Sequence, residues 1–268
     1  MKIDYDRYRE NLRIELQEGI LRLTLHNPEK LNANTDAMHW ALSRVWDDID
    51  HDDEVAVVVF TGAGDRAFSA GGDPRHMQVM RDDIRLWYRT AREAKRIVFN
   101  MLECDKPVIA RLNGHAVGFG ATLALASDII VAVQGAKFGD PHCSTGLVCG
   151  DGGALLWPLQ IGHAKAKELL FTGELLTTDE AARIGLINYA VPREELDAKV
   201  DELARKIARG AGRAIRFTKN AMNVLIRQQA HASMDLSLAT ELLSALTDDH
   251  QEAIHAFLEK RSPVFKGS

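Results

Sequence analysis

Two turns built from small residues each lie between an apolar run and a helical pattern. The first is Ala70-Gly71-Gly72-Asp73, where Asp73 is placed to cap the helix that Pro74 begins. The second is Gly118-Phe119-Gly120. Free N–H groups at a helix start attract negative charge, and two of them can hold a carbonyl oxygen that becomes negative during a reaction. The sequence therefore predicts an oxyanion hole for a carbonyl substrate, with one donor from each turn.

Alternating strands and helices are expected to position these turns. Apolar runs predict strands at 12–16, 20–25, 55–60, 106–112 and 129–133, the first two as a hairpin. Three- and four-residue spacing predicts helices at 35–49, 83–102 and 116–126, and then at 164–171, 178–184, 196–208, 213–227, 234–246 and 250–260. This order favours an α/β fold followed by a helical tail.

Length and composition limit the classes of function. The chain has 268 residues, of which 46% are hydrophobic, so it can bury a large core. Its net charge of -5 and pI near 6.1 give no reason to expect nucleic acid or an anionic membrane as a partner. No apolar run is long enough to cross a bilayer, and the N-terminus is charged. Three cysteines suggest neither a disulfide framework nor a metal site, so we expect a reducing, cytoplasmic location.

The order of short motifs along nearly the whole chain carries a resemblance. The motifs are Asn27-Pro28, Leu31-Asn32-Ala33, 67–73, 113–120, 127–130, 136–139, 170–173 and 181–191. Together they resemble the crotonase superfamily, the enoyl-CoA hydratase/isomerase family. The resemblance implies a ββα spiral core over residues 1–194 and a helical trimerisation region over 195–268. It also implies a homo-trimer or a hexamer made of two trimers.

The resemblance also implies a substrate and a site. The substrate would be an acyl-CoA thioester, so that coenzyme A enters as part of the substrate and no tightly bound cofactor or metal is expected. The backbone N–H groups of Ala70 and Phe119 would hold the thioester oxygen as an enolate forms. The expected substrate contacts are Lys30, Leu31, Ala33, Arg66, Ala67, Phe68, Gly71, Gly72, Asp73, Gly118 and Thr122.

The acid and base of the hydratases are missing from their expected positions. Two glutamates perform the water addition in those enzymes, and the matching positions here hold Thr122 and His142. Threonine is no base near neutral pH, whereas histidine has a pKa close to 7. We therefore expect weak or absent crotonyl-CoA hydration, with lyase or isomerase chemistry that depends on enolate stabilisation.

His142 and the later Gly150-Asp151-Gly152 resemble a branch of the family that cleaves carbon–carbon bonds, 6-oxocamphor hydrolase and related β-diketone hydrolases. There, His142 would activate water for a retro-Claisen cleavage and Asp151 would orient it, with Asp140 a less favoured helper. Alternatively, His142 is a pocket-wall residue, Asp151 a turn residue, and the protein binds acyl-CoA without catalysis. His39, on the first helix, is expected at the surface.

Overall fold

The computed structural model describes residues 3–268, and its strands form two sheets. The larger sheet has the order β1-β2-β3-β5-β7-β10, with bounds Leu12–Gln17, Ile20–Leu25, Val57–Gly62, Val108–Leu112, Ile129–Val133 and Tyr189–Val191. The smaller sheet has the order β4-β6-β8-β9, with bounds Ala67–Ser69, His115–Val117, Lys137–Gly139 and Leu176–Thr177. Strands β2, β3, β5, β7 and β10 are parallel, and β1 pairs antiparallel with β2 as the predicted hairpin.

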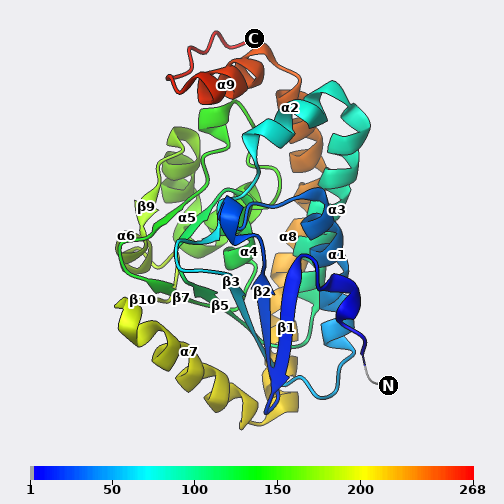
Figure 1. Cartoon of the computed structure of the whole chain (residues 1–268). Helices are drawn as coiled ribbons and strands as arrows, with labels where there is room; N and C mark the ends of the chain where they lie inside the picture. The colour runs from blue at the N-terminus through cyan, green and yellow to red at the C-terminus, as the bar shows by residue number, and fades with distance from the viewer. Residues whose placement is uncertain (1–2) are drawn as a thin grey trace.

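Successive strands alternate between the two sheets. Each of β3, β5 and β7 in the larger sheet is followed directly by β4, β6 or β8 in the smaller one, and then by helical chain. The helices are α1 Asp36–Asp50, α2 Pro74–Asp82, α3 Ile84–Glu103, α4 Phe119–Leu125, α5 Gly153–Thr172, α6 Thr178–Arg183, α7 Arg193–Ala208, α8 Gly212–Ala245 and α9 Asp248–Glu259. This is the expected ββα spiral with C-terminal helices (Figure 1).

Helices cover both faces of the larger sheet. Helix α7 packs on one face, where Leu196, Val200 and Ala204 contact apolar strand residues such as Val57 and Val131. Helices α1, α3 and α8 lie together on the other side (Figure 1). Central strands that are buried on both faces consist of continuous apolar runs, so their positions can be predicted from the sequence. No helix in the described part of the chain combines the length and apolarity that crossing a membrane requires.

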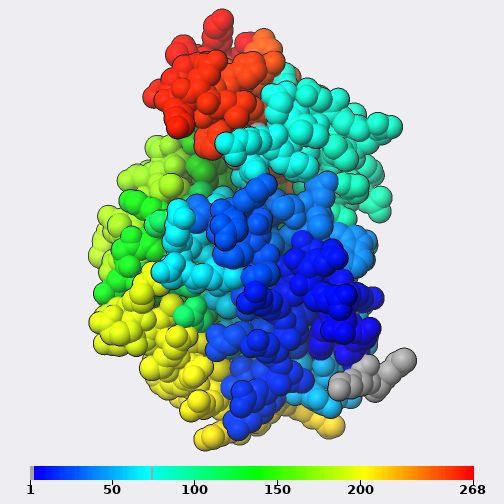
Figure 2. Space-filling view, in the orientation of Figure 1, coloured from blue at the N-terminus to red at the C-terminus, as the bar shows by residue number. Residues whose placement is uncertain are grey.

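Three expected helix boundaries differ from the structure. The helix expected at 116–126 begins only at Phe119, because residues 115–117 form β6. The helices expected at 213–227 and 234–246 are one continuous helix, α8. Helix α5 starts at Gly153, before the expected position, and is interrupted at Gly162. Figure 2 shows α9 in red against the cyan segment of α2 and α3 at one end of the molecule.

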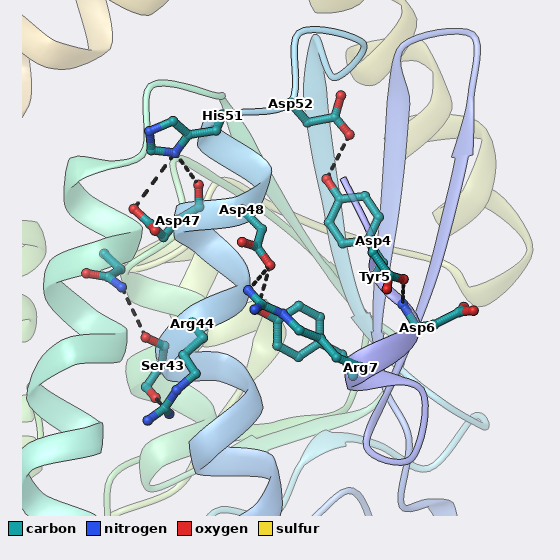
Figure 3. A network of polar contacts seen from close by, with 12 residues as sticks. Asp4, Tyr5, Asp6, Arg7, Ser43, Arg44, Asp47, Asp48, His51 and Asp52 are labelled. Carbon is teal, nitrogen blue, oxygen red and sulfur yellow. Dashed lines mark hydrogen bonds and ion pairs between the residues drawn. The ribbon is translucent and has the colours of Figure 1, made fainter. Parts of the chain in front are cut away.

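The N-terminal segment is tied to α1 by side-chain hydrogen bonds (Figure 3). The Tyr8 hydroxyl donates to Asp48 at 2.6 Å and the Tyr5 hydroxyl donates to Asp52 at 2.9 Å. Arg7 pairs with the same Asp48 carboxylate. The ring of Tyr8 is fully buried. These contacts fix the start of the chain beside the first helix.

Tyr8→Phe is expected to lower the free energy of unfolding by about 1–2 kcal/mol, because it removes a hydrogen bond to a charged acceptor and keeps the buried ring. Urea unfolding measures this loss. Tyr88→Phe is the matched control, since Tyr88 is 59% exposed. Equal unfolding midpoints for Tyr8→Phe and the wild type would contradict the expectation.

Candidate active site

The two predicted turns lie side by side because the strands before them pair. Strands β4 and β6 run parallel, with Ala67 opposite His115 and Ser69 opposite Ala116. Gly71 has φ 76°, and a Cβ there would lie 2.6 Å from the Val117 carbonyl oxygen and 3.3 Å from the Phe119 nitrogen. Only glycine tolerates both the conformation and the approach. The first turn therefore touches the second at its expected donor.

The expected donor of the first turn is occupied in this structure. The Ala70 N–H donates to the Leu31 carbonyl oxygen at 3.0 Å, so the interpretation of Ala70 as a free donor is wrong for this conformation. Leu31 adopts φ 54°, a left-handed conformation, and this directs its carbonyl toward Ala70. Phe119 begins α4, where first-turn N–H groups have no partner within the helix. A substrate oxygen would have to replace Leu31 at the Ala70 donor.

A large outer cavity of about 640 Å³ opens at these turns. Three basic residues, Lys30, Arg66 and Arg75, line it, and within residues 3–268 none of them makes an ion pair. Glu29 and Asp73 contribute negative charge to the same wall. Free cations at a wide opening suit a substrate that carries phosphate groups.

The other expected contact residues divide into three groups. Leu31, Ala33, Ala70, Gly72 and Gly118 line the outer cavity with the basic residues. Ala67 and Phe68 instead lie in the core, where Phe68 packs edge-on against Phe60, so their side chains line neither cavity. Strand β4 is buried on both faces, which the sequence motif does not reveal. Gly71 and Thr122 lie behind the cavity walls, and Asp73 caps α2 as expected.

A smaller inner cavity of about 70 Å³ adjoins the outer one. Both are lined by Gly72, Asp73, Met77, Phe119 and His142, which form the boundary between them. Behind this boundary the lining changes to Asn34, His39, Trp87, Asp151, Leu238 and Glu241, among others. His142 is therefore placed where a chain entering from the outer cavity reaches the inner one.

His142 lies between two buried aspartates. Its Nδ1 is hydrogen-bonded to Asp140, and its Nε2 is 3.6 Å from the Asp151 carboxylate. Asp151 also accepts a hydrogen bond from the Thr122 hydroxyl at 3.1 Å. The predicted pair of His142 and Asp151 is thus brought together, but Asp140 is the aspartate that holds the ring. Nε2 is left to face the cavity and Asp151.

The two aspartates control the charge of the imidazole. Burial disfavours a charged ring, but Asp140 and Asp151 together outweigh it and raise the pKa of His142 well above 6.5. Burial raises the pKa of Asp151 to about 6, in spite of the opposing charge of His142. Burial also disfavours ionisation of Asp140, yet contact with His142 lowers its pKa. These directions favour an imidazolium between two carboxylates near pH 7.

Glycines allow the carboxylates to approach this closely. A Cβ on Gly153 would overlap the Asp140 carboxylate, and one on Gly150 would lie 2.7 Å from Glu241 Oε2. Gly152 has φ 137°, and a Cβ there would lie 2.6 Å from Thr122. The expectation that Asp151 sits in a glycine turn is confirmed, and the turn also provides space for the acidic side chains of Asp140 and Glu241.

Two residues of the inner cavity were not predicted from the sequence as site residues. His39, expected at the surface, is only 8% exposed and stacks on Phe119 with ring centroids 4.9 Å apart. Glu241 comes from α8, far along the chain, and burial followed by the charge of Asp151 raises its pKa to about 8. For His39 the sequence did contain a signal, because His39 directly follows Met38, which lies on the buried apolar face of the first helix. Glu241 had no comparable signal.

Comparison with known proteins identifies the family. The model of a family described as enoyl-CoA hydratase/isomerase matches residues 15–268. The chain belongs to the enoyl-CoA hydratase/isomerase family. This hydratase/isomerase-family enzyme is 34% identical over 263 residues to a crotonyl-CoA hydratase of Syntrophomonas wolfei, covering 96% of this chain and 98% of that one.

Solved structures of similar proteins agree with the assignment to the hydratase/isomerase family. An enoyl-CoA hydratase/isomerase from Mycobacterium paratuberculosis superposes with a TM-score of 0.87 and 35% identity, covering 91% of this chain and 97% of that one. A β-diketone hydrolase from the cyanobacterium Anabaena, solved with (S)-3-oxocyclohexyl acetic acid bound, has a TM-score of 0.81 and 29% identity over 91% of this chain and 98% of its own. Proteins similar to this chain thus include a crotonyl-CoA hydratase and a β-diketone hydrolase.

Proposed function

We propose that this enzyme acts on an acyl-CoA thioester and that His142 moves the proton as an enolate forms or collapses. The observation that carries the proposal is the position of His142 at the boundary between the two cavities, with Nδ1 held by Asp140 and Nε2 facing Asp151. The coenzyme would occupy the outer cavity beside Lys30 and Arg66. The acyl group would enter the inner cavity.

The charge state assigns separate tasks to these groups. The imidazolium of His142 can donate a proton from Nε2, and the Asp151 carboxylate can accept one. The thioester oxygen would bind the Phe119 N–H and, after displacing the Leu31 carbonyl, the Ala70 N–H. Each such donor contributes about 3 kcal/mol of transition-state stabilisation. Hydration by two glutamates has no counterpart in this arrangement.

A second candidate is hydrolysis of a carbon–carbon bond in a cyclic β-diketone, without coenzyme A. The pairing of His142 with Asp151 and the similarity to the Anabaena hydrolase favour it. Water placed between Nε2 and Asp151 would give a proton to the Asp151 carboxylate as its oxygen attacks one carbonyl, and the bond to the carbon between the carbonyls would break. The second carbonyl would become the enolate in the same oxyanion hole, and its carbon would then take a proton from the His142 imidazolium.

We also propose a homo-trimer or hexamer. Helix α8 exposes a series of large apolar side chains, namely Phe217, Met222, Leu225, Leu236 and Leu243, each at least 65% exposed. Several large exposed apolar side chains on one helix are typical of an interface between subunits. Non-catalytic binding of acyl-CoA remains the third possibility and predicts a ligand without turnover.

The test combines crotonyl-CoA hydration, followed by loss of the enoyl thioester absorbance, with a panel of cyclic β-diketones and a titration with coenzyme A. The proposal predicts coenzyme A binding with weak or absent hydration and turnover of another acyl-CoA thioester. Diketone cleavage without coenzyme A affinity would instead establish the second candidate. Robust hydration that persists in His142→Ala would overturn both assignments of His142.

A further inference from the structure

Four residues that line the inner cavity carry buried polar atoms that no group within residues 3–268 satisfies. Among residues 3–268, buried side-chain atoms without a hydrogen-bond partner include Asn34 Oδ1 and Nδ2, His39 Nδ1, Thr90 Oγ1 and Glu241 Oε2. All four residues line this one cavity, although they come from separate parts of the chain. Asn34 is 4% exposed and His39 is 8% exposed. An unpaired buried polar group costs stability, so a cluster of them requires an explanation.

The positions of these residues are fixed by other contacts, so the cluster is a formed site. The Asn34 backbone N–H donates to the Gly71 carbonyl oxygen at 2.8 Å. The His39 ring lies nearly parallel to Phe119, at an interplanar angle of 13°. Glu241 packs against the backbone of Gly150. Asn34, His39 and Glu241 are thus each held by contacts with other residues, and all three line the cavity.

The unpaired atoms form a neutral lining near pH 7. Burial lowers the pKa of His39 to about 4, and burial together with the charge of Asp151 raises the pKa of Glu241 to about 8. An uncharged carboxyl group, imidazole, amide and hydroxyl group can all donate a hydrogen bond. The carboxylates of Asp36 and Asp151 also line the cavity and would repel an anion. The lining therefore suits an uncharged oxygen atom.

We propose that the inner cavity recognises an acyl group that carries an uncharged oxygen function, a hydroxyl or a keto group, beyond the reacting carbonyl. Asn34, His39, Thr90 and Glu241 supply the hydrogen bonds that this oxygen completes. A volume of about 70 Å³ limits the group to a few heavy atoms. A hydrocarbon end leaves the polar atoms unpaired, and a carboxylate end meets like charge. This inference deepens the proposed function and rests on it for the position of the reacting carbonyl.

The first experiment measures dissociation constants by calorimetry for 4-hydroxybutyryl-CoA and pentanoyl-CoA, which differ by a hydroxyl in place of a methyl group. The hydroxylated thioester is expected to bind at least about tenfold more tightly, since each hydrogen bond to a buried unpaired group has that effect. Succinyl-CoA, with a terminal carboxylate, is expected to bind more weakly than either. The pair 4-hydroxycyclohexanone and 4-methylcyclohexanone tests the same preference without coenzyme A.

Variants connect the preference to the cluster. Glu241→Met and His39→Phe replace polar groups by apolar ones of similar size, and each is expected to reduce the preference for hydroxyl over methyl. Each is also expected to raise the Tm of the unliganded protein by about 2–4 °C, because an unpaired buried polar group is removed. Glu241→Gln keeps a hydrogen-bonding group and is expected to retain the preference. A purely structural role would lower the Tm in all three variants.

The outcomes separate this inference from the proposed function. Equal binding of the two matched thioesters would overturn the inference and leave the acyl-CoA proposal intact. If only the cyclohexanones bind, the acyl-CoA proposal fails. Tighter binding of 4-hydroxycyclohexanone than of 4-methylcyclohexanone would then support the inference, and equal binding would overturn it. No binding of any of the five compounds would overturn the inference as well.

Discussion

His142→Gln is expected to lower kcat by about 10²–10⁴-fold on any substrate that the wild type converts, whether a thioester or a diketone. Glutamine fills a similar volume and keeps a hydrogen-bonding group beside Asp140, but it cannot carry a proton between Nε2 and the substrate. Thr122, at the other expected acid–base position, is fully buried and bonded to Asp151, so it provides no substitute. Steady-state kinetics measures the effect, and KM is expected to change little because the outer cavity is preserved.

His163→Gln is the matched control, since His163 is exposed on α5, and its kinetics should equal those of the wild type. Calorimetry with coenzyme A should give the same affinity for His142→Gln as for the wild type. A kcat within threefold of the wild type for His142→Gln would exclude His142 as the proton carrier. Turnover would then have to depend on Asp151 or Glu241 alone.

Asp140→Asn is expected to lower kcat and to move the alkaline limb of the pH profile to lower pH. The wild type should show an acid limb near pH 6, as Asp151 becomes ionised, and an alkaline limb well above pH 6.5, as His142 loses its proton. Removing the Asp140 charge leaves burial and Asp151 to act on the ring, so the pKa of His142 falls. The alkaline limb should therefore move to lower pH.

Asp235→Asn serves as the control, because Asp235 is an exposed carboxylate on α8 that pairs with Lys95. Its pH profile should match that of the wild type. A merely structural role for Asp140 would reduce activity equally at every pH, without a shift of the alkaline limb. A shift of that limb to higher pH would show that the assignment of the imidazolium is wrong.

Features set by local sequence were predictable from this chain. The buried strands are apolar runs, and Asp73 before Pro74 indicates the start of α2. His142 and Asp151 lie nine positions apart, on the two sides of a short 3-10 helix at Cys143–Thr145, so motif spacing was sufficient to pair them. The two small-residue turns were expected to meet, and the pairing of β4 with β6 brings them together.

Features set by tertiary packing were not predictable. Glu241 reaches the site from α8, and no local pattern distinguishes it from the exposed charges of the same helix. His39 was assigned to the surface because its neighbour Trp40 and its own polarity obscured the buried face of α1. The bond from Ala70 to Leu31 depends on a left-handed backbone at a leucine, which residue type disfavours. Each of these required three-dimensional contacts.

The most direct test of the account is the protonation state of His142, measured by ¹⁵N NMR of protein labelled at histidine and assigned with His142→Gln. We expect both ring nitrogens to carry protons at pH 7 and this signal to titrate only well above pH 6.5. The same signal should titrate at lower pH in Asp140→Asn. A neutral ring at pH 7, with a titration below 6.5, would contradict the proposed imidazolium between Asp140 and Asp151.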